Sequence, residues 1–207
     1  MRLLQEPTGK MDEQGEPTFA RKGILEWWKL WADKTPRAVS VVNGQFFNPV
    51  NQNVAPIAFS LRSRNQIVRG YGDQKEFLGE KKLLVLGQEP EVRPYNDDPA
   101  TIEKIEHDAI VGLSQTAPKS PEKRTGRTML GVDAEKRILI AQTSSATQKE
   151  VARILSDAGA EDVVMLDGGG STQLVHRGEL FIPAQEVSSA QMLRTLPQVL
   201  GIEAAEQ

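Results

Sequence analysis

The chain has 207 residues with 25 basic and 28 acidic side chains, which gives a formal net charge of -3. This length favours one domain with a sizeable core, and the charge balance argues against a general attraction to nucleic acid or to an anionic membrane surface. Without cysteine there can be no disulfide framework, thiolate nucleophile or Cys-ligated zinc, and two histidines are too few for a His-rich metal centre. Gln5 and Glu6 follow Met1-Arg2-Leu3-Leu4 at once, so no hydrophobic signal segment or membrane span is expected in these residues, and a removed signal peptide would leave the same picture.

The N-terminal part is expected to be an arm followed by a helix. Residues 1–22 are polar and rich in Pro, Gly and Glu, which predicts a loosely packed arm ahead of a domain over residues 23–207. From Ile24 to Trp31 apolar residues recur at helical spacing, and the helix is expected to end before Pro36. Tryptophans can form a sugar-stacking platform, but we interpret these three as a stripe packed against a sheet.

Short β-rich runs predict strands in the middle of the chain. The run from Ala38 to Val42 ends at Asn43, with Phe46 and Phe47 shortly after it. Two hairpins and one further strand are expected, at residues 57–61 with 66–69, residues 128–132 with 137–141, and residues 82–86. Residues 97–123 combine a charged helical pattern with a Pro-, Ser- and Thr-rich loop over 114–121.

The last third of the chain has clearer signals. Thr147 to Glu150 has the pattern of a capping box, which predicts a helix that ends at Gly159. A buried strand over residues 163–166 and a hairpin of residues 174–176 with 179–182 should follow. Together these elements predict an α/β (α+β) fold: a central mixed, mainly antiparallel sheet with flanking helices in a single domain.

The most informative stretch is the one where the 163–166 strand ends. Asp167 is followed by Gly168, Gly169 and Gly170, and then by Ser171 and Thr172. Successive glycines let backbone N–H groups approach an anionic ligand closely, and the hydroxyls add further donors. A tight turn whose polar groups satisfy only the backbone remains the alternative.

Several well-known site types do not fit. The glycine run lacks the lysine and the spacing of a nucleotide-binding P-loop, and its contiguous glycines do not match the dinucleotide fingerprint. Ser144 and Ser145 offer no nucleophile elbow. His107 and His176 have no triad context and are interpreted as surface or strand residues.

Three blocks in this order resemble the hallmark motifs of the phosphodiester glycosidase family. They are Asn43-Gly44-Gln45-Phe46-Phe47, Gly126-Arg127-Thr128-Met129-Leu130-Gly131-Val132-Asp133, and Leu166-Asp167-Gly168-Gly169-Gly170-Ser171-Thr172, with Arg194-Thr195-Leu196-Pro197 similar to the closing block. The resemblance runs from about residue 24 to residue 202. Gln45 departs from it, because many relatives carry a small residue there. The resemblance implies a hydrolase that cleaves a glycosyl 1-phosphodiester at the anomeric carbon.

The residues themselves are compatible with that chemistry, which needs a phosphate cradle and an acid or base beside the anomeric carbon. Asp167 is the expected general acid, base or nucleophile, and Arg127 offers a planar fork for two phosphate oxygens. Asn43 could bond sugar hydroxyls or phosphate. The expected substrate-binding residues are Thr128, Gly168, Gly169, Gly170, Ser171, Thr172, Phe46 and Phe47. Alternatively, Arg127 could pair with a surface acid and Asn43 could shape a turn with Gly44.

Other features of the function stay open at this stage. Glycosidases commonly use two carboxyl groups, and Asp73, Asp133 and Glu179 lie near the expected strands, although Asp133 is better explained as a turn residue. No cofactor is expected, but Asp167 is compatible with calcium or magnesium. The expected partner is a small molecule or glycan with a sugar phosphate, and the resemblance suggests a secreted or extracytoplasmic protein. A module that only binds sugar phosphates, or a phosphodiesterase that attacks phosphorus, would use the same residues.

Overall fold

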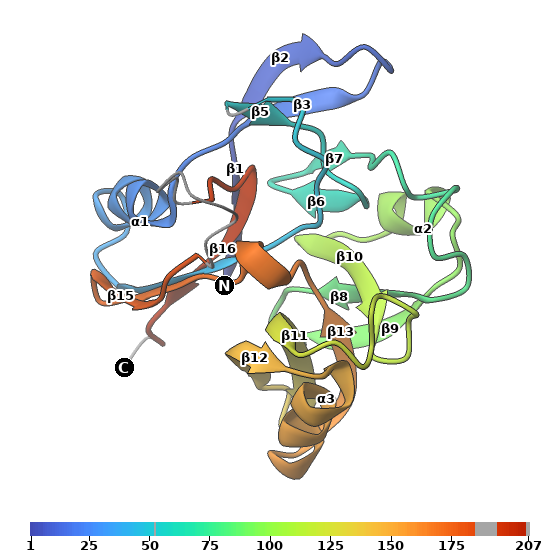
Figure 1. Ribbon diagram of the computed structural model, residues 1–207, viewed down its shortest axis with the longest axis vertical. Helices are drawn as coiled ribbons and strands as arrows, with labels where there is room; N and C mark the ends of the chain where they lie inside the picture. The colour runs from blue at the N-terminus through green and yellow to red at the C-terminus, as the bar shows by residue number, and fades with distance from the viewer. Residues whose placement is uncertain (52, 185–193, 206–207) are drawn as a thin grey trace.

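Two large antiparallel sheets and a small third sheet make up the computed structural model, which describes residues 1–51, 53–184 and 194–205 (Figure 1). The five-stranded sheet has the order β1 (Arg2–Gln5), β16 (Gln198–Glu203), β4 (Ala38–Asn43), β14 (Leu174–His176), β15 (Glu179–Ile182). The eight-stranded sheet has the order β12 (Ile138–Ala146), β11 (Thr125–Asp133), β13 (Ala160–Met165), β10 (Ala109–Ser114), β6 (Leu61–Ser63), β7 (Gln66–Val68). In the same sheet β8 (Lys81–Val85) pairs with β10, and β9 (Glu91–Tyr95) pairs with β8. The third sheet contains β2 (Pro7–Met11), β3 (Pro17–Ala20) and β5 (Val54–Ala55).

Helices are few in this fold. The described residues form α1 (Ile24–Ala32), α2 (Ala100–Glu103) and α3 (Gln148–Asp157), and a 3-10 turn over Gly169–Ser171. The prediction of one domain that combines helices with mainly antiparallel strands is therefore confirmed. Its finer form needs correction, because two large sheets replace a single central one and all the strand pairs described are antiparallel.

Two strands in the first 22 residues are packed into the fold, contrary to the expectation of a loose arm, whereas β2 between them is largely exposed. β1 pairs with β16 along its length, so the two ends of the chain lie side by side in one sheet. Leu3 and Leu4 are buried, with 2% and 9% of their surface exposed. β2 and β3 form the hairpin seen at one end of the molecule in Figure 1. Polar composition concealed these strands because only two adjacent leucines of β1 are buried.

Within residues 97–123, the loop expected over 114–121 is present, but the charged helical pattern before it is mostly not helical. Only the four residues of α2 are α-helical, and β10 follows with all six of its residues buried. β10 lies at the centre of the large sheet, where it pairs with β6, β8 and β13. A strand buried on both faces has no alternation of polar and apolar residues, so the period-2 signal is missing.

Two expectations for the helices are confirmed in detail. Thr147 and Glu150 form a capping box at the start of α3, with the Thr147 hydroxyl accepting from the Glu150 amide. Trp27 and Trp31 are buried on the face of α1, in the same apolar cluster as Val41 and Val199 of the five-stranded sheet. The tryptophan stripe is therefore part of the core.

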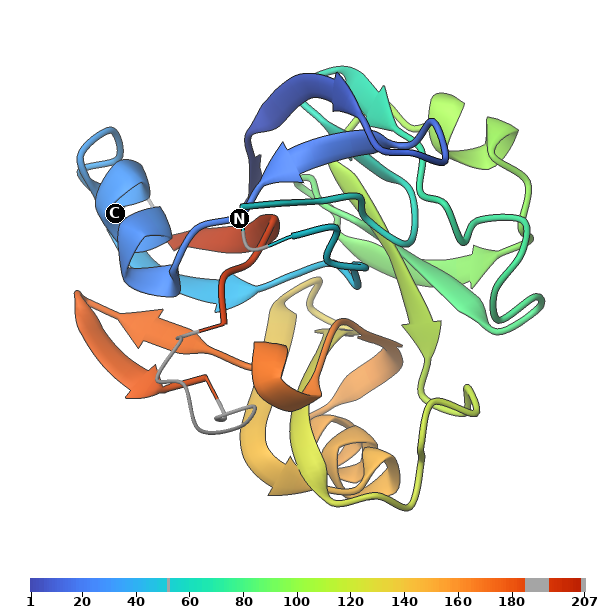
Figure 2. The same cartoon turned by 45° about the horizontal axis from the view of Figure 1, so that its top comes forward.

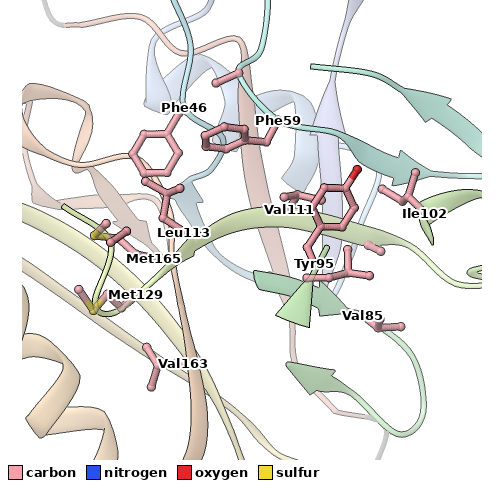
Figure 3. Packing of buried hydrophobic residues seen from close by; sticks show 14 of the residues in the cluster. Phe46, Phe59, Val85, Tyr95, Ile102, Val111, Leu113, Met129, Val163 and Met165 are labelled. Carbon is pink, nitrogen blue, oxygen red and sulfur yellow. The ribbon is translucent and has the colours of Figure 1, made fainter. Parts of the chain in front are cut away.

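The main core lies in two layers on the faces of the eight-stranded sheet. On one face the cluster in Figure 3 includes Met129, Val163 and Met165 together with Val151 of α3, and it extends to Phe46 and Phe59. Leu130 and Val164 point to the other face, where they pack with residues of the five-stranded sheet. Alternate residues of β11 and β13 thus fill different layers.

Candidate active site

Asp167 lies where the two large sheets meet. Its backbone N–H donates to the Gly44 carbonyl just beyond β4 (3.0 Å), and its own carbonyl accepts from Asn43 Nδ2 (2.7 Å). The neighbouring Leu166 N–H donates to the Thr128 carbonyl of β11 (3.0 Å). The 3-10 turn that follows Asp167, in orange at the centre of Figure 2, lies between the β14–β15 hairpin and the β11–β12 hairpin. Asp167 is therefore fixed by strands of both sheets.

The buried side chain of Asn43 holds the backbone of Asp167 in this position. Its side chain has no exposed surface, and its Oδ1 accepts from Thr128 Oγ1 (2.7 Å), Gln142 Nε2 (2.8 Å) and the Gln173 N–H (3.3 Å). Thr128 is also fully buried. From the sequence, both residues were expected to contact the substrate. The structure places them beneath the site instead, where Asn43 joins the two sheets and positions the backbone of Asp167.

The glycine run is required by close backbone packing. A Cβ on Gly168 would lie 2.7 Å from the Gly126 carbonyl oxygen, and a Cβ on Gly126 would lie 2.5 Å from the Gly169 carbonyl oxygen. Gly169 has a φ of +60°, which L side chains rarely adopt. Beyond the run, Ser171 and Thr172 turn inward and are fully buried.

Two cavities meet at Asp167. The first, which we call the glycine cavity, has a volume of about 200 Å³ and is lined by Gly168, Gly169, Arg127, Lys119, Lys123 and their neighbours. The second, the aromatic cavity, has a volume of about 190 Å³ and is lined by residues that include Phe46, Phe47, Phe59, Tyr71, Glu76, Phe77 and Arg194. Asp167, Lys119 and Phe46 line both cavities. Of the predicted binding residues, Phe46, Phe47, Gly168 and Gly169 therefore line a cavity, whereas Thr128, Gly170, Ser171 and Thr172 line neither.

Arg127 lines the glycine cavity, but its fork is already engaged. Nη1 donates to the Lys119 carbonyl (3.2 Å), and Nη2 donates to the carbonyls of Ser120 (2.6 Å) and Lys123 (3.0 Å). Only 4% of the residue is exposed, and burial lowers the pKa of its guanidinium. Arg127 thus holds the segment 119–123 in place, and in this arrangement it does not present two free donors to a phosphate.

Lys119 and Arg194 carry positive charge into the site, and the sequence analysis assigned a role to neither of them. The Lys119 ammonium lies 5.7 Å from the ring centre of Phe46 and 5.3 Å from that of Phe77. The Arg194 guanidinium lies 5.1 Å from the ring centre of Phe47. Lys119 belongs to a Pro- and Ser-rich loop without a motif, whereas Arg194 opens the closing block of the family resemblance and could have been found there.

Burial raises the pKa of the Asp167 carboxyl above its ordinary value. The Ser171 hydroxyl, the Gly168 N–H at 2.9 Å and the charges of Arg194 and Lys119 oppose this shift without cancelling it. The pKa of Tyr71 is raised to about 12, by burial first and then by the charges of Glu76 and Asp167. Asp167 is therefore a carboxyl group that keeps its proton more readily than an exposed aspartate.

The three acids considered as partners of Asp167 lie elsewhere. Asp73 accepts from the N–H groups of Ser60 (2.8 Å) and Gly70 (3.0 Å), and Asp133 is bonded to Arg137 across a hairpin turn. Glu179 is an exposed residue of β15 that lines neither cavity. Within the described residues, no three Asp, Glu or His side chains gather to hold a metal ion, and no helix is long and apolar enough to cross a membrane.

A family model described as phosphodiester glycosidase matches residues 36–203. The chain belongs to the phosphodiester glycosidase family. This confirms the resemblance carried by the three motif blocks, and the matched range begins after α1 instead of at its start. No curated protein matches the chain.

Solved structures extend the likeness to most of the chain. The catalytic domain of zebrafish N-acetylglucosamine-1-phosphodiester alpha-N-acetylglucosaminidase, auto-inhibited by its pro-peptide, is 15% identical with a TM-score of 0.65, over 98% of this chain and 82% of that one. A hypothetical protein from Synechocystis is 15% identical with a TM-score of 0.46, over 96% of this chain and 56% of that one. A protein from Burkholderia pseudomallei is 12% identical with a TM-score of 0.49, over 98% and 71%. At this identity, the first comparison shows a shared fold.

Proposed function

We propose that the protein hydrolyses a glycosyl 1-phosphodiester by breaking the bond between the anomeric carbon and the phosphate oxygen. The observation that carries this proposal is the place of Asp167 at the junction of two unlike cavities. One side offers amides and cations, and the other offers aromatic faces. A substrate that joins a phosphate to a sugar would span this junction with its scissile bond beside Asp167.

The glycine cavity has the chemistry of a phosphate site. Lys119 and Lys123 line it together with the backbone of Gly168 and Gly169. The Gly168 N–H already donates to Asp167, which leaves the Gly169 N–H and the Lys119 ammonium, close to Phe46 at the junction, to favour a bound anion. In this assignment Lys119 is the cation that contacts the phosphodiester, while Arg127 keeps the segment that carries Lys119 in position.

The aromatic cavity has the chemistry of a sugar site. Phe46 and Phe47 provide apolar faces, and Glu76 and Arg194 provide polar groups that could bond sugar hydroxyls. Such a mixture of a large apolar wall with a few polar groups is typical of small-ligand pockets. The volume of about 190 Å³ limits the bound group to one sugar residue or part of a longer glycan.

Asp167 supplies the acid in this scheme. Burial favours its protonated form, which avoids repulsion with the phosphodiester and can give a proton to the bridging oxygen as the bond to carbon breaks. The electron pair of that bond leaves with the phosphomonoester. Lys119 would stabilise the charge that grows on this leaving group.

Hydrolysis of a panel of sugar 1-phosphodiesters in ¹⁸O-labelled water tests the proposal. We expect release of a free sugar that carries the label, because water attacks carbon. Label found only in the phosphate would replace the glycosidase assignment by a phosphodiesterase. Binding of the panel by calorimetry without any hydrolysis would instead support a module that only binds sugar phosphates.

A further inference from the structure

The site contains a second carboxylate that the sequence analysis did not consider. Glu76 and Asp167 are the two acids that line the aromatic cavity. Tyr71 lines it as well, and the charges of both acids act on its hydroxyl. The two carboxylates are therefore near enough to a common point in the cavity to influence the same group.

The side chain of Glu76 differs from those of the other acids in this region because, among the described residues, it makes no hydrogen bond that stabilises the fold. Asp73, three positions earlier, is buried and bonded to two backbone N–H groups. Glu80, four positions later, accepts from the Ser114 hydroxyl (3.1 Å). In the described part of the chain the Glu76 side chain has no hydrogen bond or ion pair, and the residue is open to solvent.

Glu76 follows a tight turn and precedes a residue with an uncommon backbone conformation. The Glu76 N–H donates to the Gly72 carbonyl (2.9 Å), and a Cβ on Gly72 would lie 3.2 Å from Glu76 Oε2, so the chain turns back on itself here. Phe77 then has a φ of +49°, which is rare for a bulky residue. Strain of this kind clusters at ligand sites, and here it directs Phe77 toward the Lys119 ammonium.

We propose that Glu76 is the second catalytic carboxylate, the general base for the attacking water, and this assignment rests on the proposed function. The water oxygen forms a bond to the anomeric carbon as the bond from that carbon to the phosphate oxygen breaks. One water proton passes to Glu76, and the Asp167 proton passes to the departing phosphomonoester. Glu76 is exposed to solvent and lines only the aromatic cavity, whereas Asp167 also lines the glycine cavity, so each acid has a distinct partner.

The test compares Glu76→Ala, Glu76→Gln and Asp167→Ala on the sugar 1-phosphodiester that the wild-type protein cleaves fastest, with and without sodium azide. We expect both Glu76 variants to lose at least about a hundredfold in kcat, with KM changed much less. Azide needs no deprotonation to attack, so it should restore turnover in Glu76→Ala and give a glycosyl azide. It should not restore turnover in Asp167→Ala. Glu179→Gln, an exposed acid outside both cavities, is the matched control and should behave as wild type.

A purely structural role for Glu76 would not produce azide rescue. Activity of Glu76→Ala within about fivefold of wild type, or a large loss that azide does not rescue in a variant with unchanged thermal unfolding, would overturn the assignment of Glu76 alone. Failure of the wild-type protein to hydrolyse any member of the panel would overturn the proposed function and this assignment with it.

Discussion

Asp167 is expected to reduce the stability of the fold while it serves the proposed reaction. Its pKa is higher in the folded chain than the value of about 4 of an exposed aspartate, so the folded state binds its proton more tightly than the unfolded state does. Stability is then lost as the pH rises from about 4 through the raised pKa, and the loss is complete above it. Asp167→Asn cannot ionise, so at neutral pH it should raise the Tm, by about 2–4 °C for each kcal/mol relieved. The same variant should lose at least about a hundredfold in turnover.

Thermal unfolding of wild type and Asp167→Asn between pH 4 and pH 8 measures this effect. The difference in Tm should shrink toward pH 4, because the folded wild-type carboxyl then keeps its proton and the unfolded one is about half protonated. Asp157→Asn, on the exposed end of α3, is a suitable control and should change stability by less than about 0.5 kcal/mol. A variant Asp167→Asn that is less stable than wild type at pH 7 would contradict the argument.

At the scale of single residues, the sequence predicted which residues lie close together, but it predicted their individual roles less well. Asn43, Arg127 and Asp167 meet at one place, as strand ends with polar residues suggested. The engagement of Arg127 by three loop carbonyls could not be predicted, because those acceptors belong to backbone groups without a sequence signature. For the same reason the position of Glu76 in the aromatic cavity could not be predicted, because Glu76 follows no recognisable strand in the sequence.

At the scale of elements, the segment 119–123 should depend on Arg127 for its order. Arg127→Lys keeps the charge but cannot donate to three carbonyls from one fork, so the segment should loosen. We expect faster amide hydrogen exchange at residues 119–123 and weaker binding of inorganic phosphate. Lys119→Met should weaken phosphate binding to a similar degree while exchange in the segment stays unchanged.

The pair of variants separates two roles for Arg127. Weaker phosphate binding by Arg127→Lys without any change in exchange would mean that the guanidinium itself binds the anion, as expected from the sequence.

Elements with local signals, such as the capping box of α3, were predicted closely from the sequence. β10 and β16 were not predicted, because each pairs with strands from distant parts of the chain and local sequence patterns do not indicate such pairing.

At the scale of the whole molecule, β1 connects the beginning of the chain to two apolar clusters, one on each face of the five-stranded sheet. Successive strand residues point to opposite faces, so Leu3 packs in the cluster between the two sheets and Leu4 packs in the cluster beneath α1. Arg2 pairs with Glu203 on β16, at an exposed position that adds little stability. The contribution of β1 should therefore come from its two leucines.

Leu3→Ala and Leu4→Ala should each lower the free energy of unfolding by about 2–5 kcal/mol, the usual cost of deleting a buried leucine side chain. Denaturant unfolding measures the loss. Met11 lies on the exposed β2–β3 hairpin and is 66% exposed, so Met11→Ala is the control and should stay within about 0.5 kcal/mol of wild type. The larger effect should belong to Leu3, which has less exposed surface and lies between the sheets whose meeting point holds Asp167. If both leucine variants matched the Met11 control, β1 would contribute no more than the loose arm that its composition suggests.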